Sequence, residues 1–194
     1  MKVIYIDIGG VGEISPAAAC VATIGNFDGI HLGHQALLKE LLTLAAHYNL
    51  PSALITFEPM PTEFFLKDKA PKRITRFEEK LEILEHFAVD LIYVLPFTET
   101  LAGLSAEDFI QHILVEKLGV KHLVVGQDFR FGRNRLGDIH LLQSTGATSG
   151  FGVSIAPLLL VDGQRVSSSS IREALASGDK KAAESLLARK LIDK

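Results

Sequence analysis

The stretch Ala22-Thr-Ile-Gly-Asn-Phe-Asp-Gly-Ile-His-Leu-Gly-His34 decides the fold, because it joins a short apolar strand to an amphipathic helix. The strand is predicted over Cys20-Val-Ala-Thr-Ile24, and the leucines after His34 recur at helical spacing. A helix N-terminus presents free backbone N–H groups and a partial positive charge, so it attracts phosphate. His31 and His34 add hydrogen-bond donors that become charge-assisted if they are protonated. The stretch predicts a phosphate-binding turn, and the alternative is a glycine-rich turn whose surface histidines cap the helix.

Three glycines in this stretch, Gly25, Gly29 and Gly33, allow a ligand to approach the backbone without a Cβ in the way. Zinc binding is a weaker interpretation of the two histidines, because a third ligand of matching type is lacking and Cys20 lies inside the predicted strand.

Strand and helix patterns alternate along most of the remaining chain. Apolar strands are predicted at 52–57, 91–95 and 122–126, and helices at 77–87, 105–119, 170–176 and 180–188. Strands this apolar are usually covered on both faces, so we predict an α/β fold with a doubly wound parallel sheet and right-handed crossovers. The alternation is broken at 58–76, which has three prolines and is expected to be a loop or flap, and at 126–138, which is rich in glycine and arginine. Segment 146–165 is expected to hold one or two short strands and a turn at Asp162-Gly163.

The composition suits one globular domain over residues 1–194, since 47% of the 194 residues are hydrophobic and 22% are charged. A net charge of −3 argues against nucleic-acid binding as the main role. The single cysteine suits a reducing compartment, and neither a signal peptide nor an apolar run of ~20 residues is recognisable. We expect a cytoplasmic protein without nucleic-acid or membrane partners, and the sequence predicts no oligomeric state.

A second anion-binding motif is predicted at Arg165-Val-Ser-Ser-Ser-Ser-Ile-Arg172, where four hydroxyls precede a helix start near Ser170. Hydroxyls and free N–H groups suit an anion, and Arg172 can contact two phosphate oxygens at once. The alternative is a surplus of helix-capping groups beside a solvent-facing arginine. The sequence has no GxSxG, Walker or HExxH motif and no paired zinc cysteines, so no covalent nucleophile is evident. Two phosphate motifs without a nucleophile predict direct displacement at phosphorus, in which the protein positions groups and neutralises charge.

Two further loops follow predicted strands, at the sheet edge where α/β folds bind ligands. In Val125-Gly-Gln-Asp-Phe-Arg-Phe-Gly132, Asp128 is a candidate polar contact, and Phe129 and Phe131 either flank a planar ring or pack the loop. In Phe57-Glu-Pro-Met-Pro61, the prolines give a rigid exit from the strand, and a plain strand terminator is the alternative.

Together these motifs resemble the HxGH-type nucleotidylyltransferases, and more closely the N-terminal FMN adenylyltransferase module of bacterial bifunctional FAD synthetases. The matching segments stand in the family's order and span nearly the whole chain: GNFDGIHLGH, FEPMP, Glu79-Lys80-Leu81, Leu95-Pro-Phe97, GQDFRFG and SSSSIR. The resemblance implies a Rossmann-like fold and the transfer of AMP from ATP to FMN, giving FAD and pyrophosphate with Mg²⁺. The FMN phosphate would attack the α-phosphorus of ATP in line; no metal ligands are assigned.

The resemblance also implies roles for particular residues. His31 and His34 would hold the ATP phosphates and the developing charge, and Arg172 would grip the outer phosphates. Serines of the second motif would assist this arginine, namely Ser168 and Ser169. The nucleotide loop would consist of five consecutive residues, Gly25, Asn26, Phe27, Asp28 and Gly29. The flavin or nucleotide would be seated by residues of the two other loops, namely Phe57, Pro59, Pro61, Asp128, Phe129 and Phe131.

The sequence departs from the family's pattern at Met60, where histidine is usual, and at Ser169, where threonine is usual. The riboflavin kinase barrel of the family has no counterpart within the 194 residues, so we expect adenylyl transfer without riboflavin phosphorylation. Two alternatives remain: transfer to another phosphorylated acceptor, and a catalytically silent paralogue that binds nucleotide or flavin.

Overall fold

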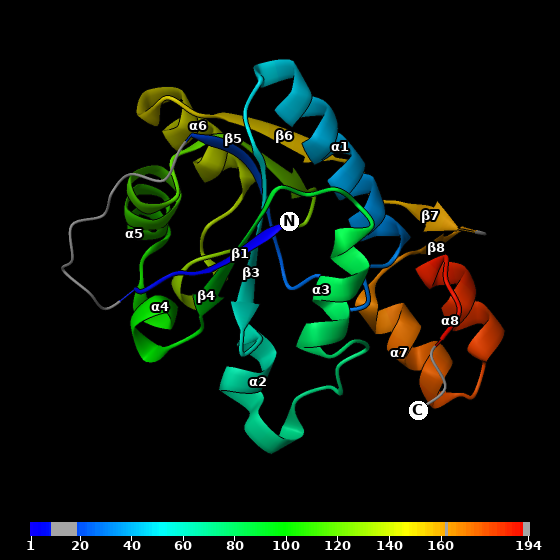
Figure 1. Ribbon diagram of the computed structural model, residues 1–194. Coiled ribbons are helices and arrows are strands. Elements are labelled where there is room, and N and C mark those ends of the chain that lie inside the picture. The colour runs from blue at the N-terminus through cyan, green and yellow to red at the C-terminus, as the bar shows by residue number, and fades with distance from the viewer. Residues whose placement is uncertain (9–18, 162, 192–194) are drawn as a thin grey trace.

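The computed structural model describes residues 1–8, 19–161 and 163–191 (Figure 1). Its centre is a sheet of six parallel strands in the order β1-β4-β3-β2-β5-β6. The strands are β1 (Lys2–Tyr5), β2 (Cys20–Ile24), β3 (Ser52–Glu58), β4 (Leu91–Pro96), β5 (Val120–Gly126) and β6 (Gly152–Ala156). This order confirms the predicted doubly wound parallel sheet.

Helices cover both faces of the sheet, as the apolar strands require. On one face, α1 (Leu32–Tyr48) and α3 (Phe77–Glu85) pack against strand residues such as Leu54 and Ile92. On the other face lie α4 (Glu99–Gly103), α5 (Ala106–Asp108), its π-helical continuation η2 (Phe109–Lys117) and α6 (Ile139–Ser149). Ser105 caps α5 by accepting the Asp108 backbone N–H, as its position before two acids predicts.

The sheet changes direction at β2, which pairs with β3 on one side and with β5 on the other. The chain leaves β2 through α1 toward β3 and reaches β5 only later, so the loops after β2 and β5 lead to opposite sides. In open α/β sheets, ligands bind at such a switch point, outside the carboxyl ends of the strands. Both glycine-rich loops of the sequence therefore meet where a ligand is expected.

A small helical pair at the carboxyl end of the chain is attached to the same edge. Helices α7 (Ser168–Ala176) and α8 (Lys180–Leu187) share a core that includes Ile171 and Leu187. The side-chain amide of Gln35 donates to the carbonyls of Ile30 and Leu187, at 3.0 and 2.9 Å. These bonds hold the helical pair, and with it the second anion-binding motif at 165–172, beside the loop after β2.

Helices lie in and next to the two regions that break the alternation. Segment 58–76 holds α2 (Pro61–Leu66) and the short 3₁₀ turn η1 (Lys67–Lys69), because Pro61 occupies the first helical turn, where its missing N–H costs nothing. Helix α6, which Asp138 caps by accepting the Leu141 N–H at 2.9 Å, begins directly after segment 126–138 and extends into 146–165. The short strands expected in 146–165 are β6 and the hairpin strands β7 (Leu160–Val161) and β8 (Gln164–Arg165).

The start of α7 differs from its predicted position. Helix α7 begins at Ser168 rather than near Ser170, because Ser167 caps it and accepts the Ser170 N–H at 3.1 Å. Asp162 of the predicted turn lies outside the described residues. In the described ranges, no helix combines the length and the apolar character needed to cross a bilayer.

Candidate active site

The two histidines of the first motif stack on each other at the start of α1. His31 is the N-cap residue, and its Nδ1 accepts the backbone N–H of His34 at 3.2 Å. The ring centroids are 3.6 Å apart with an angle of 14° between the planes, and Phe27 lies 4.7 Å from the His34 ring. A Cβ at Gly33 would stand 3.2 Å from the His31 ring, so glycine leaves the space that the stack needs.

Both imidazoles are neutral near neutral pH. Burial lowers the pKa of His31 to about 4, and burial, together with His31 and Lys80, places the pKa of His34 well below its usual value. Charge-assisted hydrogen bonds from these histidines would require protonated imidazoles, and the lowered pKa values of both side chains oppose protonation. Because Nδ1 of His31 accepts a hydrogen bond, its proton is assigned to Nε2, which makes Nε2–H the available donor.

Asp28 joins three segments that are distant in sequence. The carboxylate is 2% exposed and accepts the backbone N–H groups of Ile74 and Thr75, at 3.0 and 3.1 Å. Arg172 contributes a third bond, from Nη2 at 2.6 Å. In the nucleotide-free protein this arginine therefore lies on a carboxylate rather than free in solvent.

The second motif also contacts the first through its serines. Ser168 Oγ donates to the carbonyl of Asp28 at 2.9 Å, whereas Ser169 is exposed. The structure thus brings the two predicted phosphate loops together, and with them residues to which the resemblance assigns nucleotide contacts: His31, His34, Asp28, Ser168 and Arg172.

Lys80 is a site residue that the analysis of residue patterns missed. Its side chain is 1% exposed, and Nζ donates to the carbonyl of Asn26 at 2.7 Å. Burial lowers the pKa of the ammonium, and the charges of Asp28 and Glu58 oppose that shift. Helical spacing could have indicated its burial, because Lys80 lies three residues after Phe77 and four before Leu84, on the apolar face of α3.

An ion cluster fixes the segment between α2 and α3 near this site. Arg73 donates from Nη1 and Nη2 to both carboxylate oxygens of Glu58, at 3.0 and 2.7 Å, and it also contacts Glu63. Arg73 holds the pKa of Glu63 below its usual range. Because Glu58 ends β3 and Glu63 lies on α2, Arg73 links both elements and fixes segment 58–76 to the sheet.

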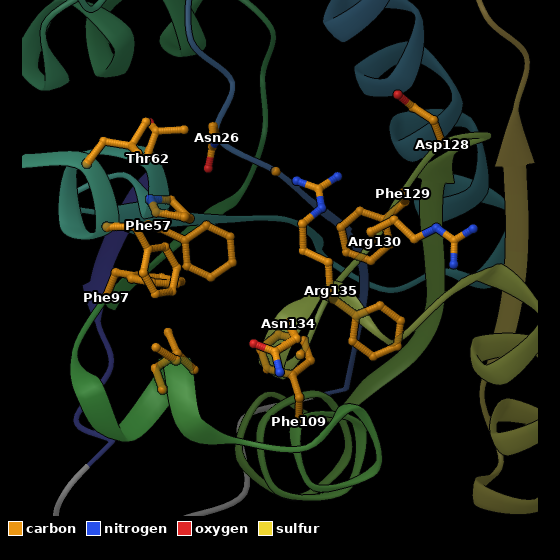
Figure 2. Close-up of a pocket in the computed structure, with 18 residues that line it drawn as sticks. Asn26, Phe57, Thr62, Phe97, Phe109, Asp128, Phe129, Arg130, Asn134 and Arg135 are labelled. Atoms are coloured by element: carbon orange, nitrogen blue, oxygen red, sulfur yellow. The ribbon is translucent and has the colours of Figure 1, made fainter. Parts of the chain in front are cut away.

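A cavity of about 730 Å³ opens beside the end of β2 (Figure 2). Its walls contain six phenylalanines, Phe57, Phe65, Phe97, Phe109, Phe129 and Phe131. Phe57 and Phe97 meet edge to face at 5.7 Å, and Phe129 and Phe131 lie nearly parallel at 5.5 Å. Phe131 also packs against Phe109 at 5.8 Å, so the loop packs and lines the cavity at once.

Several residues predicted to seat the ligand take different positions. Phe57, Pro61, Phe129 and Phe131 line the cavity, but Pro59 is exposed and does not. Asp128 stands at the rim, turned away from the phenylalanines and paired with Arg165.

Met60, at the departure from the family pattern, is only 2% exposed and is absent from the cavity wall. Its backbone N–H donates to Glu63 at 2.8 Å, at the start of α2. The methionine therefore removes no polar side chain from the cavity wall.

Comparison with known proteins agrees with this architecture. The family model described as FAD synthetase matches residues 14–170. The chain belongs to the FAD synthetase family. A bifunctional riboflavin kinase/FMN adenylyltransferase of Escherichia coli K12 is 46% identical over 182 residues, which cover 93% of this chain and 58% of the relative. The protein of the same name from Pseudomonas fluorescens is 46% identical over 170 residues, covering 88% of this chain and 54% of the relative. The chain thus spans a little more than half the length of these family members.

Among solved structures, a crystal structure named as a macrolide-efflux protein from Streptococcus pneumoniae superposes with a TM-score of 0.84. Sequence identity is 27%, and the match covers 98% of this chain and 61% of the other. This similarity confirms the α/β fold over almost the whole chain.

Proposed function

We propose that this chain transfers the adenylyl group of ATP to FMN, forming FAD and pyrophosphate. The observation that carries the proposal is an aromatic cavity lined by Gly25 and Asn26, in the loop that leads directly to the stacked His31 and His34 at the start of α1. Family membership supports it, as do the names of the relatives. We further infer that residues 1–194 form one adenylyltransferase module, in keeping with a sheet whose strands β1 to β6 share one core.

The nucleotide would lie at the N-terminus of α1. Free backbone N–H groups there attract the ATP phosphates, and the Nε2–H of His31 adds a neutral donor. Donors aimed at charge that develops during the reaction usually contribute the largest part of catalysis. Arg172 and Ser168, at the start of α7, are placed to hold the outer phosphates, with Arg172 exchanging part of its contact with Asp28 for the ligand.

The reaction would be a single in-line displacement. An oxygen of the FMN phosphate attacks the α-phosphorus of ATP, forming a new P–O bond. The bond between the α-phosphorus and the oxygen that bridges to the β-phosphorus breaks, and pyrophosphate leaves with that electron pair. No side chain is required as a nucleophile.

The flavin ring would occupy the phenylalanine walls of the cavity. Aromatic rings favour offset-stacked or edge-to-face contacts, and both arrangements exist among these side chains. The volume of about 730 Å³ falls within the usual range of roughly 300–1,000 Å³ for ligand pockets.

Magnesium is implied by the family, and the described residues contain no cluster of three His, Cys, Asp or Glu side chains suited to a metal ion. Enzymes commonly hold Mg²⁺ through substrate phosphates and one or two carboxylates. This donor set fits an ion that enters with ATP, and its chemistry would be to neutralise phosphate charge. Asp28 is the buried carboxylate nearest to the proposed phosphate contacts, through its bond to Arg172.

The test is product analysis with Mg-ATP and one acceptor at a time. FMN is expected to give FAD and pyrophosphate; pyrophosphate only with nicotinamide mononucleotide or phosphopantetheine would favour another acceptor. Flavin binding without pyrophosphate would favour a silent paralogue. Residues 1–194 are not expected to convert riboflavin and ATP to FMN, because both phosphate motifs are assigned to adenylyl transfer. We also propose a cytoplasmic location, which the reduced, buried Cys20 suits.

A further inference from the structure

Arg135 is a cation in the aromatic cavity, and its guanidinium has no polar partner among the residues that the structure describes. Two arginines line the cavity, Arg130 and Arg135. Arg130 contacts Asp138 at 3.4 Å, whereas the guanidinium of Arg135 forms no hydrogen bond or ion pair within the described part of the chain. Figure 2 shows this guanidinium between Phe129 and Asn26, directed toward the end of β2. Arg135 is an exposed residue, so its charge is accessible to a ligand, and it lines the same cavity as Gly25 and Asn26 in the loop after β2.

The backbone around Arg135 is held in an unusual conformation. Asn134 and Arg135 have φ values of 57° and 58°, in the left-handed region that side chains with a Cβ disfavour. The loop is closed by two backbone bonds between Phe131 and Gly137, at 3.2 and 2.9 Å. A Cβ at Gly137 would stand 2.7 Å from the Phe131 ring, so the loop is tightly packed. Strained conformations enforced by their surroundings gather at functional sites.

We propose that Arg135 binds the phosphate monoester of the acceptor flavin and thereby selects FMN over riboflavin. This inference rests on the proposed function. With the ring among the phenylalanines, the ribityl tail extends toward Gly25 and Asn26, which line the same cavity. A guanidinium can hold two phosphate oxygens in parallel, which leaves the third free to attack. Riboflavin has the same ring and no phosphate, so it gains nothing from this contact.

The first test is fluorescence titration of FMN and riboflavin without ATP, using Arg135→Ala. The matched control is Arg133→Ala, which removes an exposed arginine of the same loop that does not line the cavity. We expect Arg135→Ala to weaken FMN binding by roughly 10- to 100-fold, the scale of a charge-assisted contact, and to leave riboflavin binding unchanged. Arg133→Ala should change neither, and unchanged riboflavin binding also shows that the cavity is intact.

Arg135→Lys should restore part of the FMN preference, because lysine keeps the charge and loses the two-pronged contact. Equal weakening of both flavins would indicate a packing role and overturn the inference, as would unchanged FMN affinity. If the wild type makes FAD while Arg135→Ala keeps its preference for FMN, this inference fails and the proposed function stands. If the wild type binds neither flavin, both fail.

Discussion

Acidification is expected to destabilise the nucleotide-free protein through His31. Burial lowers the pKa of this histidine in the folded state to about 4, from an ordinary value of 6.5. A histidine with a lowered folded-state pKa takes up its proton first in the unfolded chain. Stability is therefore intact above pH 6.5 and falls as the pH drops from 6.5 toward 4.

The magnitude follows from the two pKa values. Linkage between them gives a loss of about 2 kcal/mol in the free energy of unfolding from pH 7 to pH 5, and about 3 kcal/mol by pH 4. For a chain of this size, 2 kcal/mol corresponds to a fall of roughly 4–8 °C in Tm. The lowered pKa of His34 acts in the same direction, so the wild type should lose at least this much.

The assay is chemical denaturation of the wild type and His31→Asn at pH 7 and pH 5, without nucleotide. Asparagine is a strong N-cap residue and does not titrate here, so α1 keeps its cap while the linkage disappears. The wild type should lose about 2 kcal/mol more than the variant between the two pH values. His140→Asn, at an exposed position on α6, should follow the wild type. Equal losses in the wild type and His31→Asn would refute the assignment of a low pKa to His31.

Three further predictions concern the site. Lys80→Met keeps the buried stem and removes the ammonium from the Asn26 carbonyl; we expect pyrophosphate release to fall roughly 10-fold or more while riboflavin titration is unchanged, and an unchanged kcat would contradict a positioning role. Arg172→Ala should raise the KM for ATP roughly 10-fold and the KM for FMN much less, and equal effects on both substrates would argue against a phosphate contact. Phe57→Ala should weaken FMN binding by roughly 10-fold without changing the KM for ATP, and unaltered flavin titration would place the ring elsewhere.

Local patterns were sufficient for the four central strands of the sheet, and the two phosphate motifs stay predictions. In β3, Ser52–Glu58, the first five residues are buried in succession and most of them are apolar. Such a pattern is typical of a strand that is covered on both faces of a parallel sheet. The start of α1 and the start of α7 carry glycine and hydroxyl signals within a few residues. Because both are helix N-termini after turns, their anion-binding character could be inferred without tertiary structure.

The elements that escaped prediction depend on tertiary contacts. Strand β1, Lys2–Tyr5, is an edge strand with two exposed and two partly buried residues; its short apolar run was not assigned to a strand, because only the pairing with β4 shows that it belongs to the sheet. Helix α2 was not predicted, because Pro59 and Pro61 also suit the end of a strand and were interpreted as the start of a loop. The cavity joins Phe97, after β4, to Phe109, in η2, and nothing in the spacing of these residues shows that they face each other.

A net charge of −3 argues against nucleic-acid binding, yet it does not oppose a site for polyphosphate, because the relevant charges are local. Lys80 is buried and Arg172 is partly exposed near the loop after β2, and the charges of both act on one buried carboxylate, Asp28. In a low-dielectric interior, charges interact more strongly than at the surface, and screening by salt is weaker. Burial, with smaller contributions from His31 and Lys80, holds the pKa of His34 well below its usual value, so this imidazole is neutral near neutral pH. In the proposed function, positive charge would therefore come from Lys80 and Arg172, while the neutral histidines would contribute directed hydrogen bonds to the phosphates.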